Sequence, residues 1–182
     1  MTCIAAIVDK KTVYIGGDSA GVAGLNLRVR EDKKVFINGD YIIGFTSSFR
    51  MGQLLQYAKL PEIPKEENLD LHRFMCTDFQ DALRKLYKEK GFLERENDVE
   101  SGGTFIIGVR GKLFIVEDDF QVAIPSDNFS AVGCGEAYAL GSLYATEGTQ
   151  MKPEQRLKLA LETAEHFSAG VRKPFTIKSL KV

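Results

Sequence analysis

Short runs rich in β-branched and aromatic residues alternate along the chain with longer stretches in which apolar residues recur every three or four positions. The short runs predict antiparallel hairpins in the first quarter of the chain, over residues 3–8, 12–17, 35–37 and 41–46. Their turns fall at Asp9-Lys10-Lys11 and at Asn38-Gly39-Asp40, the second being a strong turn signal. Residues 18–32, which are Gly-rich and then charged, predict a connecting loop.

Helical periodicity predicts four helices. We expect them over residues 51–58, from 71 to a stop at Gly91, over residues 136–145, and from Pro153 to Phe167. Further strands are predicted over residues 104–109, 113–116, 121–124 and 175–180, and a polar, mobile stretch over residues 94–103. Because each helix has one apolar face, the order of elements indicates an α+β fold with two sheets and helices packed outside them. No linker interrupts the pattern, so we expect one domain over residues 1–182.

Composition narrows the classes of function. The chain is 44% hydrophobic and 27% charged, with 24 basic and 25 acidic residues, so no excess of positive charge favours nucleic acid as a partner. The apolar runs are too short to span a bilayer, and the first residues lack the basic region of a signal peptide. We therefore expect a cytoplasmic protein with no membrane contact. Three cysteines without a CxxC pair, and only two histidines, predict neither disulfides nor a metal site.

Thr2 is the first candidate for chemistry. A threonine hydroxyl is a weak nucleophile and needs a base within hydrogen-bonding distance. If Met1 is removed, the free α-amine of Thr2 becomes that base, since its reference pKa is about 7.7–8.0. A small second residue is what methionine-removing enzymes accept, although threonine at this position is also common in proteins without any such activity.

Asp18 and Lys34 extend this hypothesis. Asp18 closes the second predicted strand and Lys34 opens the third, so antiparallel pairing could bring both side chains beside Thr2. A lysine cation there would lower the pKa of the Thr2 ammonium and stabilise a threonine alkoxide, while Asp18 would orient the lysine. The alternatives are an aspartate in a turn and a solvated Lys33-Lys34 pair.

The chain resembles the proteasome β-subunits and the bacterial HslV-type peptidases. The resemblance is carried by Thr-Cys-Ile-Ala-Ala-Ile-Val, Ile-Gly-Gly-Asp-Ser, Lys-Lys-Val, Ile-Gly-Phe-Thr and Ala-Val-Gly-Cys-Gly. In that family the catalytic aspartate follows the nucleophilic threonine by 16 residues and the lysine follows it by 32. Thr2, Asp18 and Lys34 have the same separations, which selects Lys34 over Lys33.

The resemblance implies a four-layer αββα sandwich of the N-terminal-nucleophile hydrolases. It also implies threonine-dependent cleavage of unfolded polypeptides inside a ring of identical subunits, with no organic cofactor and with an ATPase unfoldase as a further candidate partner. The backbone N–H of Ser47 takes the position of the oxyanion hole, where the family has a Gly pair and this chain has Ser47-Ser48. Cys134 and Gly135 take the position of the turn that holds the N-terminal amine, with Cys134 in place of a serine.

Further positions follow from the same resemblance. Phe45 and Phe49 fall at the specificity pocket, where their rings suggest a shallow or plugged apolar site, although ordinary core aromatics are an equal alternative. The carbonyls of Glu165, Ser168 and Val171 fall where HslV-type members hold a monovalent cation. His166 falls on the family's aspartate of the last helix, and we favour a packing or supporting role for it over proton transfer.

Three other interpretations stay open at this point. Cys134 could itself be a nucleophile, but no base stands at a recognisable spacing from it. A retained Met1 would block the amine of Thr2 and give a catalytically silent, ring-forming subunit, and the altered Gly and Ser positions would also suit a non-catalytic ring-forming binding protein. A small-molecule amidase of the same superfamily would use the same residues on a different substrate.

Overall fold

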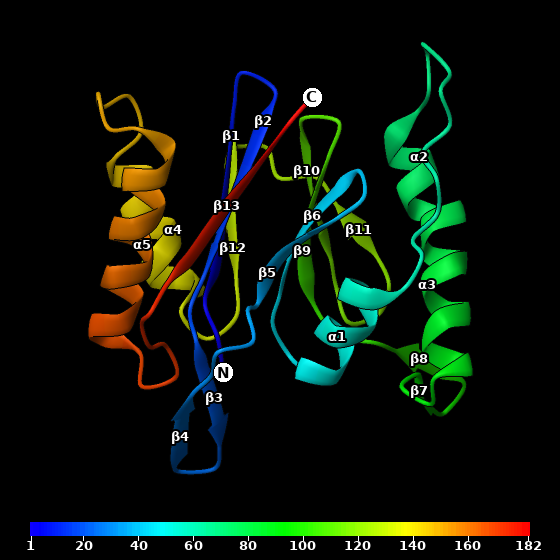
Figure 1. Ribbon diagram of the computed structural model, residues 1–182, viewed down its shortest axis with the longest axis horizontal. Coiled ribbons are helices and arrows are strands. Elements are labelled where there is room, and N and C mark those ends of the chain that lie inside the picture. Colours follow the sequence, from blue (N-terminus) through cyan, green and yellow to red (C-terminus); the bar gives the residue numbers. More distant parts are fainter.

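The computed structural model describes residues 1–182 and has four layers, with two sheets in the middle and helices on both outer faces (Figure 1). One sheet has the order β12 (Phe129–Val132), β1 (Ile4–Asp9), β2 (Thr12–Gly17) and β13 (Thr176–Lys181). The other has the order β11 (Val122–Ala123), β10 (Lys112–Val116), β9 (Phe105–Val109), β6 (Tyr41–Phe45) and β5 (Val35–Asn38). Neighbouring strands pair antiparallel throughout both sheets.

The helices form the two outer layers. The four-stranded sheet is covered by α4 (Glu136–Ala145) and α5 (Pro153–Phe167). The five-stranded sheet is covered by α1 (Phe49–Tyr57), α2 (Leu71–Cys76) and α3 (Asp78–Glu89). This arrangement confirms the αββα sandwich and the placement of the helices outside the sheets.

Alternation along β1 explains how one strand serves two interfaces. Ile4 and Ala6 belong to the apolar cluster between the two sheets, whereas Ala5 and Ile7 belong to the cluster beneath α4 and α5. Successive side chains of a strand point to opposite faces, so a strand buried on both faces is apolar throughout. A third cluster, rich in aromatic residues, lies between the five-stranded sheet and α1–α3.

The first predicted hairpin is confirmed, with β1 and β2 in register from Asp9 opposite Thr12. Lys10 and Lys11 form its two-residue turn with φ values of 45° and 65°. Positive φ at both turn positions gives the twist that antiparallel strands require. The hairpin of β5 and β6 is confirmed too, and Gly39 supplies the positive φ of 58° at its turn.

Two predicted loops are wrong, because each contains a short hairpin. Residues 18–32 include β3 (Ala20–Ala23) and β4 (Asn26–Val29), and residues 94–103 include β7 (Glu94–Glu96) and β8 (Val99–Ser101). Every residue of β4 and β7 is exposed, so these strands carry no alternation between core and solvent that the sequence could reveal.

Three further details differ from the expectations. The strand β12 has no counterpart among the predicted strands. The long helix expected from residue 71 is broken at Thr77, whose hydroxyl donates to the Arg73 carbonyl and whose backbone leaves helical geometry at φ −114° and ψ −88°. Phe167, which continues the apolar spacing of the last predicted helix, is 62% exposed and stacks on Tyr138 instead of packing in the core.

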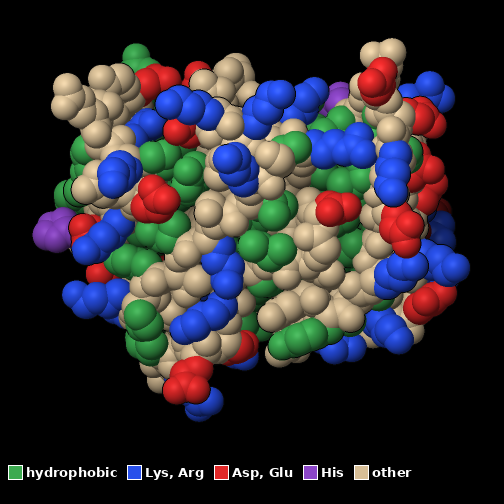
Figure 2. All heavy atoms as spheres, turned by 45° about the horizontal axis from the view of Figure 1, so that its top comes forward, with side chains coloured by type: hydrophobic (Ala, Val, Ile, Leu, Met, Phe, Trp, Pro, Cys, Tyr) green, Lys and Arg blue, Asp and Glu red, His purple; other side chains and the backbone are tan.

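Charges are mixed over the surface. On the face drawn in Figure 2, basic and acidic side chains are interspersed with apolar ones, and neither charge gathers at one end of that face. None of the helices has the length and apolar character needed to cross a membrane.

Candidate active site

Thr2, Asp18 and Lys34 meet where the two sheets come together. Thr2 lies two residues before β1, Asp18 directly follows β2, and Lys34 directly precedes β5 of the other sheet. The Lys34 Nζ lies 2.8 Å from the Thr2 Oγ1 and 2.8 Å from the Asp18 Oδ1. All three side chains are buried, so the chain brings together the three residues that the spacing selected.

The Asp18 carboxylate is held by four donors. Its Oδ1 accepts from the Lys34 Nζ at 2.8 Å and from the Cys3 N–H at 3.1 Å. Its Oδ2 accepts from the Ala20 N–H at 2.8 Å and the Arg172 N–H at 3.2 Å. A buried carboxylate is costly unless it is paired and hydrogen-bonded, and these contacts fix its orientation toward Lys34.

Lys34 is a cation in a buried position, only 1% exposed. Burial lowers the pKa of the Lys34 ammonium, and the neighbouring Asp18 carboxylate opposes that shift. Lys33, its neighbour in the sequence, is exposed. Two adjacent lysines therefore have opposite environments, and only Lys34 can act on Thr2.

Thr2 is held on both sides of its α-carbon. Its hydroxyl donates to the Met1 carbonyl at 2.6 Å, and its N–H donates to the Cys134 Sγ at 3.2 Å. With Met1 attached, this nitrogen is an amide and cannot act as a base. Removal of Met1 would leave an amine at the same place, beside the hydroxyl and within the reach of Cys134.

The turn after β12 approaches Thr2 closely. The Gly135 N–H donates to the Thr2 carbonyl at 3.2 Å, and the Cys134 Sγ lies 3.4 Å from the Ser168 Oγ. Gly133 has a φ of 98°, and a Cβ there would collide with the Thr2 carbonyl. Cys134 and Gly135 thus surround the backbone of Thr2, as the resemblance implied.

Both serines that replace the family's Gly pair have structural partners. Ser47 has a φ of 62°, and its Oγ accepts from the Thr104 N–H at 3.1 Å. The Ser48 Oγ caps α1 by accepting from the Arg50 N–H at 3.1 Å. The Ser47 N–H has no acceptor within the chain and lies at the cavity beside Thr2, where it is available to an oxyanion.

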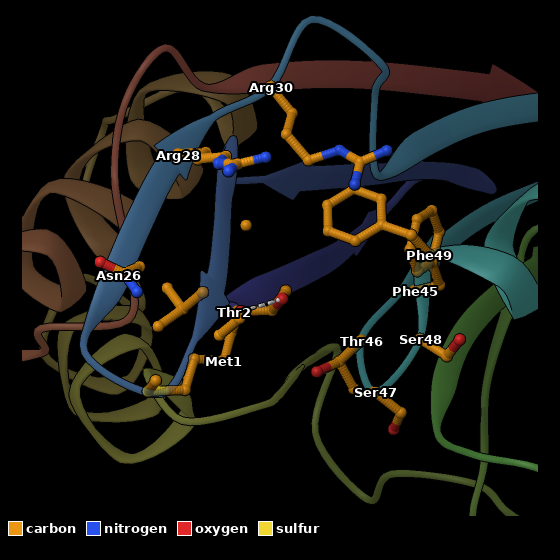
Figure 3. A pocket seen from close by; sticks show the side chains of 13 residues that line it. Met1, Thr2, Asn26, Arg28, Arg30, Phe45, Thr46, Ser47, Ser48 and Phe49 are labelled. Atoms are coloured by element: carbon orange, nitrogen blue, oxygen red, sulfur yellow. Dashed lines mark hydrogen bonds between the residues drawn. The ribbon is translucent and has the colours of Figure 1, made fainter.

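A cavity of about 390 Å³ opens beside Thr2 (Figure 3). Phe45 and Phe49 line one wall, with their rings packed edge to face and 5.6 Å between centroids. The expectation of a shallow or plugged apolar pocket is wrong in its polarity, because Arg28 and Arg30 also line this cavity. These arginines lie on and just after β4, the strand that the sequence pattern missed.

The remaining predicted positions lie at the end of α5. The Ser168 carbonyl accepts from the Val171 N–H at 3.3 Å, and the Glu165 carboxylate accepts from the Lys173 N–H at 3.0 Å. One lone pair of the Ser168 oxygen is thereby used, and the monovalent cation stays a prediction. His166 is exposed and packs edge-on against Phe167, 4.6 Å between centroids.

Sequence reasoning missed the parts of the site that are backbone groups. The Ala20 and Arg172 N–H groups bind Asp18, and Gly133 and Gly170 make room for Thr2 and Met1. Backbone donors leave no signal in residue identity. The two glycines do leave a signal in residue identity, because a side chain at either position would collide with Met1 or Thr2.

The chain is similar to known proteins over nearly its whole length. No family model matches the chain. The ATP-dependent protease subunit HslV of Caldicellulosiruptor saccharolyticus is 26% identical over 184 aligned positions, covering 98% of each chain. A solved structure of Thiobacillus denitrificans BPH in complex with epoxomicin has a TM-score of 0.81 at 23% identity, covering 99% of this chain and 98% of its own. Eukaryotic HslV from Trypanosoma brucei has a TM-score of 0.70 at 17% identity over the full length of both chains. At these identities the two solved structures establish the fold.

Proposed function

Because the chain is homologous to the HslV-type proteasome β-subunits, we propose that it is a threonine-type endopeptidase subunit that hydrolyses peptide bonds of unfolded polypeptides. The observation that carries the proposal is that the Lys34 Nζ hydrogen-bonds both the Asp18 Oδ1 and the Thr2 Oγ1, at 2.8 Å in each case. These two hydrogen bonds place the Lys34 ammonium beside the Thr2 Oγ1, the oxygen that must become the nucleophile.

Activation begins with the removal of Met1. The amide nitrogen of Thr2 then becomes an amine, which accepts the proton of the Thr2 hydroxyl. The Lys34 ammonium stabilises the developing alkoxide, and its charge disfavours protonation of the nearby amine. Asp18 acts as a positioning residue, since its contact with the reacting atoms runs through Lys34.

The reaction itself has two stages. The Thr2 Oγ1 attacks the substrate carbonyl, and the Ser47 N–H donates to the tetrahedral oxyanion. The amine returns its proton to the leaving nitrogen, and an ester joins Thr2 to the acyl part of the substrate. Water, deprotonated by the same amine, hydrolyses the ester and restores the free hydroxyl.

Self-association into a ring is part of the same proposal. Several of the exposed apolar side chains group at two places: Leu25, Leu27 and Val29 on the projecting hairpin of β3 and β4, and Tyr138, Tyr144 and Phe167 on α4 and α5. Surfaces of this kind mark contacts between subunits, and a ring would enclose the active sites. An ATPase unfoldase as partner and a cytoplasmic location are proposed from the homology.

The test uses epoxomicin, the molecule bound in the Thiobacillus denitrificans BPH structure. Purified protein without Met1 should gain the mass of one inhibitor, and digestion should map the adduct to the N-terminal peptide. The Thr2→Ala variant should gain none. Unfolded casein should be degraded by the wild type and left intact by this variant.

Each alternative has its own result. Protein that keeps Met1 in its own host, and remains unlabelled, would establish a silent subunit. Labelling and hydrolysis of short acyl amides without degradation of casein would establish an amidase. Light scattering decides assembly, since a stable monomer at micromolar concentration contradicts the ring.

A further inference from the structure

Two cavities of opposite charge flank Thr2. The first, of about 390 Å³, is lined by Arg28 and Arg30 and by no carboxylate. The second, of about 470 Å³, is lined by Glu117 and Glu136 and by no Lys or Arg. Met1, Thr46 and Ser47 line both cavities, so the two cavities adjoin next to Thr2, which itself lines the first.

In the first cavity, Arg30 is fixed and its charge is compensated. Its guanidinium makes two hydrogen bonds to Asp32, at 2.7 and 2.6 Å, and stacks 3.7 Å from the centroid of the Phe49 ring. Its stem crosses over Gly21, where a Cβ would come within 2.8 Å of the Arg30 Cδ. Arg30 therefore forms a rigid wall of the cavity.

Arg28 in the same cavity has no such partner. Its backbone pairs with Gly21 in the β3–β4 hairpin, but its guanidinium makes no hydrogen bond or ion pair within the chain. Figure 3 shows Arg28 and Arg30 along one side of the cavity, with Thr2, Thr46 and Ser47 on the other. An uncompensated guanidinium beside the nucleophile attracts a carboxylate and repels a Lys or Arg side chain.

The second cavity has the reverse preference. Glu117 uses one carboxylate oxygen to accept from the Thr104 hydroxyl at 3.3 Å, whereas Glu136 has no hydrogen-bonded partner. Burial, and then the Glu117 charge, raise the pKa of the Glu136 carboxyl, as expected for two carboxylates that share one space. A cation bound between them would relieve their repulsion.

We propose that the substrate cleft is charge-polarised: it takes an acidic side chain in the Arg28 cavity and a basic side chain in the Glu117–Glu136 cavity, on opposite sides of the cleaved bond. This inference rests on the proposed peptidase function and names its substrate class. Met1 lies between the two cavities, so its removal makes one continuous groove that passes over the Thr2 hydroxyl.

The test is a set of four unstructured peptides that differ only at the two residues around one bond: Glu-Lys, Lys-Glu, Glu-Glu and Lys-Lys. Mass spectrometry of the products gives the cleaved bond and kcat/KM. One of the two mixed orders should exceed both like-charge peptides by about tenfold at 0.1 M salt. The advantage should shrink at 1 M salt, where the Debye length falls to about 3 Å.

Variants assign the two preferences. Arg28→Ala should lower the ratio of cleavage of the preferred mixed peptide to cleavage of Lys-Lys by about tenfold. Glu136→Gln should lower the ratio of cleavage of the preferred mixed peptide to cleavage of Glu-Glu. Arg50→Ala, which removes a nearby arginine outside both cavities, should change neither ratio. Equal cleavage of all four peptides, or equal effects of the Arg28 and Arg50 variants, would overturn the proposal.

A binding measurement separates this inference from the proposed function. The Thr2→Ala protein should bind the preferred mixed peptide more tightly than either like-charge peptide by fluorescence anisotropy, because binding needs no nucleophile. Selective binding without hydrolysis by the wild type would refute the peptidase and keep the polarised cleft. Labelling by epoxomicin together with equal binding of all four peptides would support the peptidase and refute the polarised cleft.

Discussion

Replacing Lys34 by Met removes the charge and keeps most of the packing volume. The lost interaction with Thr2 is a 2.8 Å charge-assisted hydrogen bond. Bonds of this kind contribute about 1.5–3 kcal/mol, and each 1.4 kcal/mol of lost transition-state stabilisation lowers the rate about tenfold. With the loss of the charge that tunes the amine included, turnover should fall about a hundredfold or more.

The same substitution should destabilise the fold, because Asp18 would stay buried without its cation. Breaking one partner of a buried pair costs about 3–5 kcal/mol, and the three backbone N–H donors left on Asp18 place the expected loss near the lower figure. For a chain of this length, about 3 kcal/mol lowers Tm by roughly 6–12 °C. Activity should therefore be measured at 25 °C, with folding checked by circular dichroism.

Two control variants separate the chemical effect from the structural one. Lys33→Met changes an exposed lysine and should leave turnover and Tm nearly unchanged. The double variant Asp18→Asn with Lys34→Met removes both buried charges, so it should recover part of the lost Tm without recovering activity. If Lys33→Met abolished epoxomicin labelling and Lys34→Met did not, the assignment of the site would be wrong by one residue.

Three further predictions follow from the surroundings of the site. Ser47→Ala should lower the free energy of unfolding by about 1 kcal/mol, because it loses the bond to the Thr104 N–H, whereas Ser47→Gly should be near neutral since it also relieves the positive φ; urea denaturation measures both. Burial and the Asp18 charge raise the pKa of the Cys3 thiol to about 12, so iodoacetamide at pH 8 should label Cys134 and Cys76 in the native protein and Cys3 only after unfolding, and early labelling of Cys3 would contradict the burial. Because burial lowers the pKa of the Lys34 ammonium, kcat/KM should fall on the alkaline side at a pH below 10.5. The folded state binds this proton less tightly than the unfolded state, so the contribution of Lys34 to the free energy of unfolding should rise with pH through the same window. The difference in unfolding free energy between wild type and Lys34→Met, followed against pH, measures this contribution.

The sequence predicted most of the elements that are buried on one or both faces, although it missed the buried strand β12. Apolar runs and helical spacing located β1, β2, α1, α4 and α5 to within a few residues, because burial imposes a period on residue type. The exposed strands β4 and β7 have no such constraint, and they were taken for loops. The break at Thr77, where the backbone leaves helical geometry, does not interrupt the apolar spacing that predicted one long helix.

The candidate site also has parts that the sequence predicted and parts that it did not. Thr2, Asp18 and Lys34 could be named from spacing because each contributes a side chain at a fixed separation. The polarity of the adjoining cavity could not, because Arg28 and Arg30 approach it only through the unpredicted hairpin of β3 and β4. The donors that hold Asp18 are backbone groups, and residue type does not encode them.

The hydrogen bonds of Asp18 and Thr2 also order events during synthesis. The Thr2 N–H contacts Cys134, 132 residues further along the chain, and Asp18 accepts from Arg172, 154 residues further along. Translation proceeds from the N-terminus, so a chain shorter than about 172 residues lacks a donor to the carboxylate that orients Lys34. A nascent or truncated chain that ends before Arg172 therefore carries Thr2, Asp18 and Lys34 without one of the donors that fix the Asp18 carboxylate, and the site is complete only once Arg172 has been made.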